Sequence, residues 1–323
     1  MERIQQLQQD FADFLEKCDL DGQPNELYAP ISYTLRQPGK RLRPMLCLLA
    51  NDMFGGKEEE ALWPALALET FHNFTLIHDD IMDKAPVRRG LPTVYQKWNS
   101  DIAILSGDNM LAMAFEFALK ATKGSEAARL LGKVAREVCE GQQYDLNFET
   151  RGNVSINEYL EMIRLKTAVL LATSLQMGAM LAGATPKDQQ ALYDFGIAIG
   201  ISFQLQDDIL DLYSDVEVFG KRHGGDIADN KKTYLYLKAL ELASDSDRKR
   251  LIQLFEMHVD HDEEEKIAEV KAIYDRLKVK EAVEKVMAQY DQRAFASLDS
   301  INLPEEKKAH LRRYAEKLAG RKK

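Results

Sequence analysis

Apolar residues recur at spacings of three and four along almost the whole chain, which is the spacing of one face of an α-helix. No segment shows the strict alternation of apolar and polar residues that is typical of a half-buried strand. Turn-forming pairs such as Gly55-Gly56, Gly152-Asn153 and Thr185-Pro186 separate the periodic segments. The pattern predicts an all-α protein, with helices near residues 2–18, 25–37, 43–53, 59–84, 93–121, 125–149, 156–183, 187–214, 232–243, 246–257, 263–299 and 304–318.

Composition favours a single domain over the whole chain, residues 1–323. The sequence has 323 residues, of which 45% are hydrophobic and 29% are charged, so it can bury a sizeable core. No segment rich in proline, glycine and serine marks a linker between domains. The expected architecture is therefore a single-domain helical bundle.

Four further observations limit where the protein works and what it binds. The cysteines, Cys18, Cys47 and Cys139, are far apart and odd in number, so we expect neither a disulfide framework nor a zinc site. This cysteine usage predicts a cytoplasmic location. Residues 1–21 are amphipathic and do not have the pattern of a signal peptide. The longest apolar segment, residues 167–184, contains polar side chains and predicts a buried helix rather than a membrane span. The formal net charge of -9 opposes binding to nucleic acid.

Two acidic blocks carry the strongest chemical signal. They are Asp79-Asp80-Ile81-Met82-Asp83, the first aspartate motif, and Asp207-Asp208-Ile209-Leu210-Asp211, the second aspartate motif. On a helix that advances about 100° per residue, the first, second and fifth residues of each motif project within an arc of about 100°. Carboxylates crowded beside apolar segments need strong compensation, and Mg²⁺ ions bound through oxygen ligands fit best.

Basic residues lie in the segments near these motifs. Pro86-Val87-Arg88-Arg89-Gly90 follows the first motif, and Lys221, Arg222 and Lys231-Lys232 follow the second. Gly39-Lys40-Arg41-Leu42-Arg43-Pro44 lies at the opening of a predicted helix, where backbone N–H groups also favour anions. Acids and cations together indicate a phosphorylated substrate, because Mg²⁺ can bridge carboxylate oxygens to phosphate oxygens.

The ordered set of motifs resembles the trans-isoprenyl diphosphate synthases. The main matches are Gly39-Lys40 with Arg43, the first aspartate motif with its trailing Arg88-Arg89-Gly90, and Phe203-Gln204-Leu205-Gln206 before the second motif. Further matches are Gly141-Gln142-Gln143-Tyr144-Asp145, Lys166-Thr167, Gly220-Lys221, Asp226-Ile227 and Asn230-Lys231. The resemblance runs from about Gly39 to Lys232 and implies the isoprenoid synthase type of helical bundle, with a central cavity.

The resemblance implies that the six motif aspartates bind metal. About three Mg²⁺ ions would lie on the diphosphate of an allylic substrate, held by Asp79, Asp83 and Asp207. The other motif aspartates would be inner or outer ligands: Asp80, Asp208 and Asp211. Two polar residues would support the first metal cluster, namely Gln142 and Asp145.

The resemblance also assigns residues to two substrates. Side chains that grip the allylic diphosphate directly would be Arg88, Lys166, Lys221 and Lys231. The second substrate, isopentenyl diphosphate, would bind without metal to Lys40, Arg43, His72 and Arg89. Thr167 and Gln204 would lie near the reacting carbons.

The implied chemistry agrees with these charges. Breaking the allylic C–O bond leaves negative charge on the diphosphate and positive charge on carbon, and cations at the leaving oxygens lower that barrier. The alkene of isopentenyl diphosphate would attack the carbocation, and proton loss to the released diphosphate would give a product one C5 unit longer. No side-chain nucleophile is needed.

Product length is expected to depend on the helix before the first aspartate motif. Phe74 and Phe71 lie five and eight residues before Asp79, roughly 7.5 Å and 12 Å along the helix. In the resembled family a bulky residue at the nearer position limits chain growth, and a second aromatic directly after it shortens the product further. That residue is Thr75 here, and the motif lacks the two-residue insertion of many bacterial farnesyl diphosphate synthases. The sequence therefore favours a C20 product over C15, with core packing as the alternative role of both phenylalanines.

Two other functions stay open at this point. A class I terpene cyclase also ionises an allylic diphosphate, but its second metal motif normally reads Asn-Asp with later Ser and Glu, and it has no need of a second diphosphate site. A non-catalytic subunit of a heteromeric prenyl synthase usually loses acids from one motif, whereas both are complete here. His72 could instead be an ordinary core histidine, and His78 is interpreted as structural.

The resemblance further implies a homodimer formed through the helix at residues 93–121, with small-molecule substrates. The basic C-terminus, Arg321-Lys322-Lys323, could fold over the isopentenyl site. Deleting Gly320–Lys323 should then raise the KM for isopentenyl diphosphate.

Overall fold

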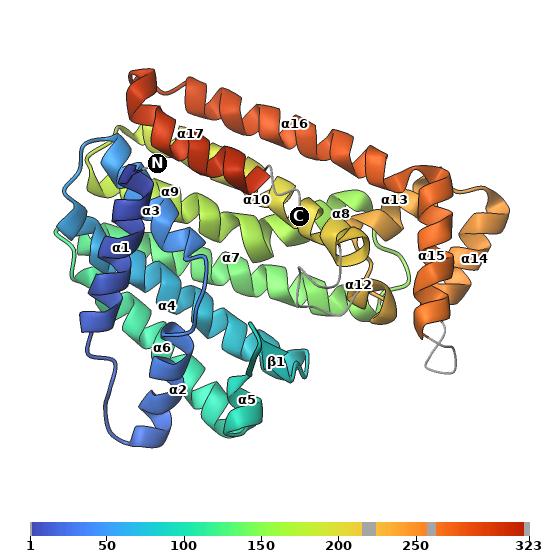
Figure 1. Cartoon of the computed structure of the whole chain (residues 1–323), viewed down its shortest axis with the longest axis horizontal. Helices are drawn as coiled ribbons and strands as arrows, with labels where there is room; N and C mark the ends of the chain where they lie inside the picture. Colours follow the sequence, from blue (N-terminus) through green and yellow to red (C-terminus); the bar gives the residue numbers. More distant parts are fainter. Residues whose placement is uncertain (1, 215–223, 257–262, 320–323) are drawn as a thin grey trace. The chain divides into compact units, whose positions relative to one another are not determined.

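The protein forms two compact units, each built from separate segments of the chain. A computed structural model describes residues 2–214, 224–256 and 263–319, and most of them are helical (Figure 1). Unit 1 comprises the residues up to Arg136 together with Leu170–Asp194 and Leu298–Tyr314. Unit 2 comprises Glu137–Val169, Phe195–Ser297 and the residues from Ala315. The all-α class predicted from the sequence is confirmed.

The longest helix that lies wholly within unit 1 is α4, and it packs against both α3 and α6 (Figure 1). Buried residues lie on all sides of α4, as expected of a helix that is apolar almost all round. The elements that lie wholly in unit 1 are α1 (Glu2–Lys17), α2 (Asn25–Leu35), α3 (Leu42–Met53), α4 (Glu58–Met82), β1 (Val87–Arg88), β2 (Leu91–Pro92), α5 (Val94–Lys97) and α6 (Ser100–Leu119). The helices that contribute residues to both units are α7 (Gly124–Thr150), α9 (Val169–Leu181), α10 (Pro186–Tyr213), α16 (Val279–Asp299) and α17 (Glu305–Ala319).

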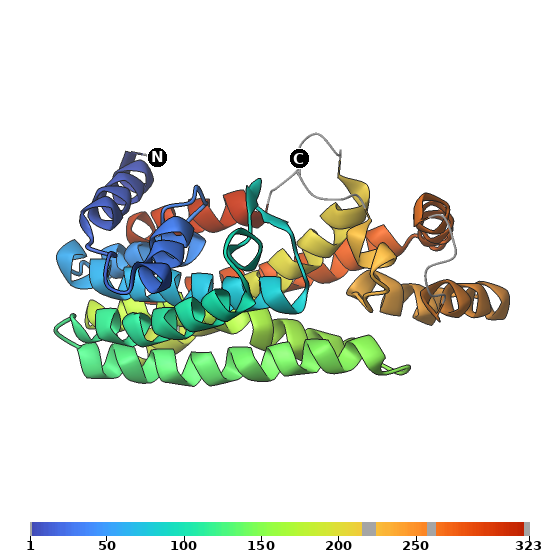
Figure 2. The same ribbon diagram turned by 90° about the horizontal axis from the view of Figure 1, so that it is seen from below.

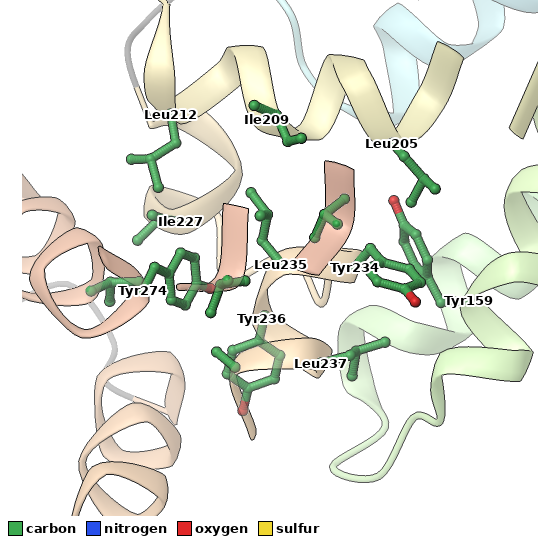
Figure 3. Packing of buried hydrophobic residues seen from close by; sticks show 14 of the residues in the cluster. Tyr159, Leu205, Ile209, Leu212, Ile227, Tyr234, Leu235, Tyr236, Leu237 and Tyr274 are labelled. Carbon is green, nitrogen blue, oxygen red and sulfur yellow. The ribbon is translucent and has the colours of Figure 1, made fainter. Parts of the chain in front are cut away.

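Unit 2 is built around a cluster of buried apolar and aromatic side chains. Figure 3 shows Leu205 and Ile209 from α10 together with the tyrosines Tyr159, Tyr234 and Tyr274 in this cluster. The elements that lie wholly in unit 2 are α8 (Ile156–Ile163), the π-helical turn η1 (Arg164–Ala168), α12 (Gly225–Ala228), α13 (Tyr234–Leu242), α14 (Asp245–Glu256) and α15 (Glu263–Leu277). Helices α13, α14 and α15 pack on one another, and their orange ribbons can be followed in Figures 1 and 2.

Three of the predicted helices are interrupted, and each interruption has a local cause. The predicted helix at 93–121 is two helices, because Asn99 is extended and its side chain accepts a hydrogen bond from Ile102 N (2.8 Å), which caps α6. The predicted helix at 263–299 breaks at Lys278, whose φ of 54° is left-handed. The predicted helix at 156–183 contains η1, a turn with one residue more than an α-helical turn.

A short antiparallel hairpin, β1–β2, is the one sheet in the part of the chain that the structure describes, and the helical pattern did not predict it. Its pairs are Val87 with Pro92 and Arg88 with Leu91. The two residues between the strands, Arg89 and Gly90, have φ values of 54° and 77°. Two consecutive positive φ values are typical of a type I′ turn, which matches the twist of the flanking strands. The Arg-Arg-Gly sequence therefore builds a turn as well as supplying charge.

Candidate active site

The first aspartate motif closes α4, and its second residue is buried. Asp80 is 4% exposed and accepts a hydrogen bond from Arg88 Nε (2.8 Å), with Arg88 Nη2 2.7 Å from the same oxygen. Burial raises the pKa of Asp80, and the Arg88 guanidinium opposes that rise. Asp83 N–H donates to Asp79 O (2.8 Å) at the end of the helix, and the Asp83 side chain is exposed. Asp80 thus anchors the hairpin, while Asp79 and Asp83 are the more open members of the motif.

Residues predicted to bind isopentenyl diphosphate gather around His72 in unit 1. Burial holds the pKa of His72 well below 6.5, and the positive charges of Arg43 and Arg89 add to the lowering. Burial also lowers the pKa of Arg43 to about 10, against the attraction of Glu69. Arg43 Nε is buried and has no hydrogen-bond partner among the described residues. A neutral histidine beside arginines whose charged form is disfavoured by burial makes a site to which an anion is attracted in addition to Glu69.

The loop before α3 belongs to the same basic site. A Cβ atom built on Gly39 would lie 3.3 Å from Arg89 Nη1, so the backbone beside Lys40 lies directly against that guanidinium. Arg41 has a left-handed φ of 46° and donates hydrogen bonds to Leu35 O (2.6 Å) and Gln37 O (2.7 Å).

A buried network supports this loop from α4. Arg41 Nη1 lies 2.6 Å from Glu69 Oε1, and Asn73 Nδ2 donates to the same oxygen (3.0 Å). Both Glu69 and Asn73 are almost completely buried. The sequence interpretation missed all three residues, although Arg41 lies inside the basic motif, because their roles depend on a contact across 28 residues.

The two phenylalanines before the first motif lie on one side of α4. Phe71 is fully buried and Phe74 is 9% exposed, and their ring centroids are 5.6 Å apart. The Phe74 ring also meets His78 edge-on, with centroids 4.9 Å apart. Thr75 donates a hydrogen bond to His72 O (2.8 Å) and adds no aromatic bulk beside Phe74.

The side chain of His78, which belongs to α4, packs against α6. Its Nε2 atom lies 3.2 Å from Ile104 O, and a Cβ atom built on Gly107 would lie 2.3 Å from Nε2. Gly107 therefore leaves the space that the imidazole fills. These contacts agree with the structural role expected for His78.

The second aspartate motif closes α10 in unit 2, and its second residue is also buried. Asp208 is 3% exposed, and its Oδ2 accepts a hydrogen bond of 2.5 Å from the Tyr159 hydroxyl. Gln204 Nε2 donates to Asp208 Oδ1 (3.3 Å). Burial raises the pKa of Asp208 well above 3.8, and the negative charge of Asp226 adds to the rise. Sequence reasoning missed Tyr159, which lies 49 residues before its partner.

The π-helical turn η1 positions Lys166 and Thr167. Lys166 Nζ lies 2.6 Å from Asp145 Oδ2, and Thr167 Oγ1 donates to Gln204 Oε1 (3.2 Å). A Cβ atom built on Gly141 would lie 2.3 Å from Lys166 N, so α7 and η1 are in backbone contact. Single π-helical turns occur frequently at functional sites. The structure therefore brings together four predicted site residues within unit 2, Lys166 with Asp145 and Thr167 with Gln204.

The segment after the second motif folds back onto it. Asp211 Oδ2 accepts a hydrogen bond from Asp226 N (3.1 Å), and Asp226 Oδ1 lies 3.6 Å from Lys231 Nζ. Lys266 of α15, which is 8% exposed, donates to Asn230 Oδ1 (2.6 Å) and holds this segment in place. Lys221, predicted to bind the allylic diphosphate, lies outside the described residues.

The motif residues fit Mg²⁺ in donor type. Each motif offers carboxylate oxygens and no nitrogen or sulfur donor, which is the preference of a hard divalent cation. The raised pKa of Asp208 comes from burial and from neighbouring carboxylates, a crowding that a cation relieves. Within residues 2–214, 224–256 and 263–319, no three His, Cys, Asp or Glu side chains already lie close enough to hold a metal ion.

Comparison with known proteins identifies the family. The sequence profile described as polyprenyl synthetase matches residues 24–277. The chain is 40% identical over 256 residues to a short chain isoprenyl diphosphate synthase of Methanothermobacter thermautotrophicus, covering 78% of each chain. It is 43% identical over 222 residues to a geranylgeranyl diphosphate synthase of Methanosarcina mazei, covering 68% of each.

A solved structure agrees with these relatives. The crystal structure of a geranylgeranyl pyrophosphate synthase aligns over 99% of both chains with a TM-score of 0.94 and 41% sequence identity. The resemblance inferred from the motifs is confirmed over most of the chain. The chain belongs to the polyprenyl synthetase family.

Proposed function

We propose that the protein is a short-chain trans-prenyltransferase that joins isopentenyl diphosphate to an allylic diphosphate and releases diphosphate. The observation that carries this proposal is the basic site around His72, where burial lowers the pKa of the histidine and Arg43 Nε is buried without a hydrogen-bond partner among the described residues. A terpene cyclase needs no such second diphosphate site. A non-catalytic subunit does not require both aspartate motifs, and both are complete here. We further propose that residues 1–323 act as one catalytic domain.

Mg²⁺ would be held by Asp79, Asp83 and Asp207, with Asp80, Asp208 and Asp211 as inner or outer ligands. When bound, the metal supplies positive charge at the departing diphosphate oxygens. Two contacts support the outer role of the second residue in each motif: Asp80 is already bonded to Arg88, and Asp208 to Tyr159. Gln142 and Asp145 of α7 would support the first cluster, and Asp145 also fixes Lys166.

The chain's cations would bind the allylic diphosphate and stabilise the charge that develops on it. Lys166 Nζ lies 2.6 Å from an Asp145 oxygen, so its ammonium group is oriented before substrate arrives, and Lys231 Nζ lies 3.6 Å from Asp226 Oδ1. Arg88 would act from the hairpin, and Lys221 from the segment outside the described residues. Thr167 and Gln204, which are bonded to each other, would face the reacting carbons and orient the allylic chain.

Lys40, Arg43, His72 and Arg89 would bind isopentenyl diphosphate without metal. The neutral His72 can donate one hydrogen bond to a phosphate oxygen without adding to the charge of the arginines. Fixing this substrate converts attack on the allylic cation into a step within one complex, which supplies much of the remaining acceleration. The proton released in the last step would go to the departing diphosphate.

We propose a C20 product. Phe74, five residues before Asp79, is the aromatic residue that stays slightly exposed, whereas Phe71 is fully enclosed, and this difference supports Phe74 as the residue that would stop the growing chain. Thr75 leaves more room than a second aromatic would.

We also propose a cytoplasmic homodimer. Ile104, Leu105 and Leu119 on α6 are 43%, 59% and 56% exposed, and a second copy would cover these apolar side chains. The same helix, Ser100–Leu119, is the one helix of the described chain that is long and apolar enough to cross a membrane by length and composition. Dimer formation accounts for the apolar composition of this helix better than insertion into a membrane, because 44% of its most apolar segment is already buried inside the protein.

The test is a Mg²⁺-dependent assay with labelled isopentenyl diphosphate and each of three starters: dimethylallyl, geranyl and farnesyl diphosphate. A C20 diphosphate is the expected product, and C15 would contradict the assignment of Phe74. Cyclic hydrocarbon formed without consumption of isopentenyl diphosphate would instead identify a terpene cyclase. No turnover with any starter would indicate a missing partner subunit.

A further inference from the structure

A cavity of about 380 Å³ lies in unit 1 between α1 and the loop of residues 36–41. Its volume is within the range of small-molecule sites, roughly 300–1,000 Å³. The bottom of the cavity is apolar and includes Phe11, Leu15 and Met45. Of the residues given a role in the reaction above, Lys40 alone lines it, so this cavity is not the substrate site.

The rim of the cavity carries more positive than negative charge. Arg36, Lys40 and Arg41 line it, against a single acid, Glu16. Arg36 Nη1 is 3.9 Å from Glu16 Oε1, and the two side chains are 38% and 75% exposed, so this ion pair holds Arg36 only weakly. Arg41 is paired with Glu69 and adds little net charge, so the positive charge of the rim comes from Arg36 and Lys40. An anion is therefore attracted to the rim, and a hydrocarbon group to the bottom.

The loop of residues 36–41 is a wall shared with the basic site around His72. On one side of this loop, Gly39 lies against the Arg89 guanidinium. Pro38, Gly39 and Lys40 also line the cavity. The Lys40 ammonium can bind an anion on either side of this wall, but not on both at once. A ligand in the cavity therefore competes for a cation that isopentenyl diphosphate uses.

We propose that this cavity binds an anionic amphiphile, with a phosphate or diphosphate head group on Arg36 and Lys40 and a short hydrocarbon tail over Phe11 and Leu15. Occupancy weakens the binding of isopentenyl diphosphate through Lys40. The binding half of the proposal rests on the cavity alone, and the coupling half rests on the function proposed above.

Two substitutions test the cavity without altering a residue of the reaction. Ala12→Trp places a large side chain into the cavity from an exposed position on α1, and Arg36→Gln removes one rim cation. Lys17→Gln is the matched control, because Lys17 is exposed on the same helix and does not line the cavity. Decyl phosphate is the probe, with decanol and inorganic phosphate as probes that lack the head or the tail. Binding is measured by calorimetry, and circular dichroism checks that each variant is folded.

Decyl phosphate should bind the wild-type protein more tightly than either decanol or inorganic phosphate. Ala12→Trp and Arg36→Gln should each weaken its binding at least tenfold, and Lys17→Gln should leave it within twofold. Saturating decyl phosphate should raise the KM for isopentenyl diphosphate at least threefold in the wild-type enzyme and not in Ala12→Trp.

Equal affinity of the wild-type protein and Ala12→Trp for decyl phosphate, or no binding to either, would overturn the cavity assignment. If Arg36→Gln bound the probe as tightly as Lys17→Gln, the rim charge would have no role and the proposal would fail in its stated form. Binding that depends on Ala12 but leaves KM unchanged would refute the coupling. Intact binding without any turnover would contradict the proposed function and leave the cavity assignment standing.

Discussion

Arg43 should make the folded protein less stable while making it able to bind isopentenyl diphosphate. Burial lowers the pKa of Arg43 from 12.5 to about 10. Each pKa unit corresponds to about 1.4 kcal/mol, so keeping this charge costs the folded state about 3 kcal/mol. The folded pKa is the lower one, so the cost is fully present at pH 7 and is relieved only as pH rises from about 10 toward 12.5.

Arg43→Met tests this cost, because methionine keeps an unbranched stem and removes the charge and the buried Nε donor. Without substrate at pH 7, the free energy of unfolding should rise by up to about 3 kcal/mol. At about 2.1 cal/mol/K per residue, the unfolding entropy of 323 residues predicts a Tm higher by about 4 °C. Loss of a hydrogen bond between charged groups, about 1.5–3 kcal/mol, should raise the KM for isopentenyl diphosphate about 10- to 100-fold.

Inorganic diphosphate without metal separates the two effects. It should raise the Tm of the wild-type protein, because the anion balances the charge of Arg43, and it should raise the Tm of Arg43→Met clearly less. Arg129→Met is the control, since Arg129 is exposed on α7, and its stability should stay within about 0.5 kcal/mol of wild type. A Tm of Arg43→Met at or below that of the wild-type protein, with unchanged KM, would refute the reasoning and show that attraction to Glu69 outweighs burial.

Three further predictions concern other parts of the site. Tyr159→Phe removes the hydroxyl that donates a hydrogen bond of 2.5 Å to Asp208, so it should lower the free energy of unfolding by about 1–3 kcal/mol and lower kcat at least tenfold. A normal kcat at saturating Mg²⁺ would show that this bond does not position Asp208. Phe74→Ala should lengthen the product beyond C20, as measured by chromatography. Phe71→Ala, at a fully buried ring, should mainly destabilise the fold by about 3–5 kcal/mol. An unchanged product length with Phe74→Ala would show that Phe74 does not stop chain growth. Because the pKa of His72 in the folded protein is below 6.5, the unfolded chain takes up a proton at His72 first as pH drops, so the free energy of unfolding should fall below pH 6.5. His72→Asn should flatten this dependence of stability on pH, measured by denaturant unfolding. An equal dependence in both proteins would contradict a neutral, buried imidazole.

Sequence reasoning about the site depends on residue type and short spacing. The aspartate motifs and Lys166 with Thr167 stand out because charged or polar groups in apolar helices are costly unless they are used. Helical periodicity likewise located most of the helices to within a few residues. Both signals are local, and both survive without knowledge of the fold.

Contacts between distant segments could not be predicted in this way. The Tyr159–Asp208 bond joins residues 49 apart, and nothing in the spacing of α8 singles out that tyrosine. The backbone contact of Gly141 with Lys166 appears in sequence only as a glycine in a long helix. The left-handed residue Lys278 interrupts a periodic pattern that continues across it. In each case the deciding interaction is tertiary, so it outweighs local preference.

The turn at Arg89-Gly90 limits how this enzyme can be improved in the laboratory. A residue other than glycine or asparagine at a left-handed position costs roughly 1–2 kcal/mol, so any screen that scores thermal resistance alone will favour Gly or Asn in place of Arg89. Such a change would make the hairpin easier to form and would remove a cation beside His72. Libraries selected for heat tolerance should therefore drift toward folded but inactive proteins at this position unless turnover is selected at the same time.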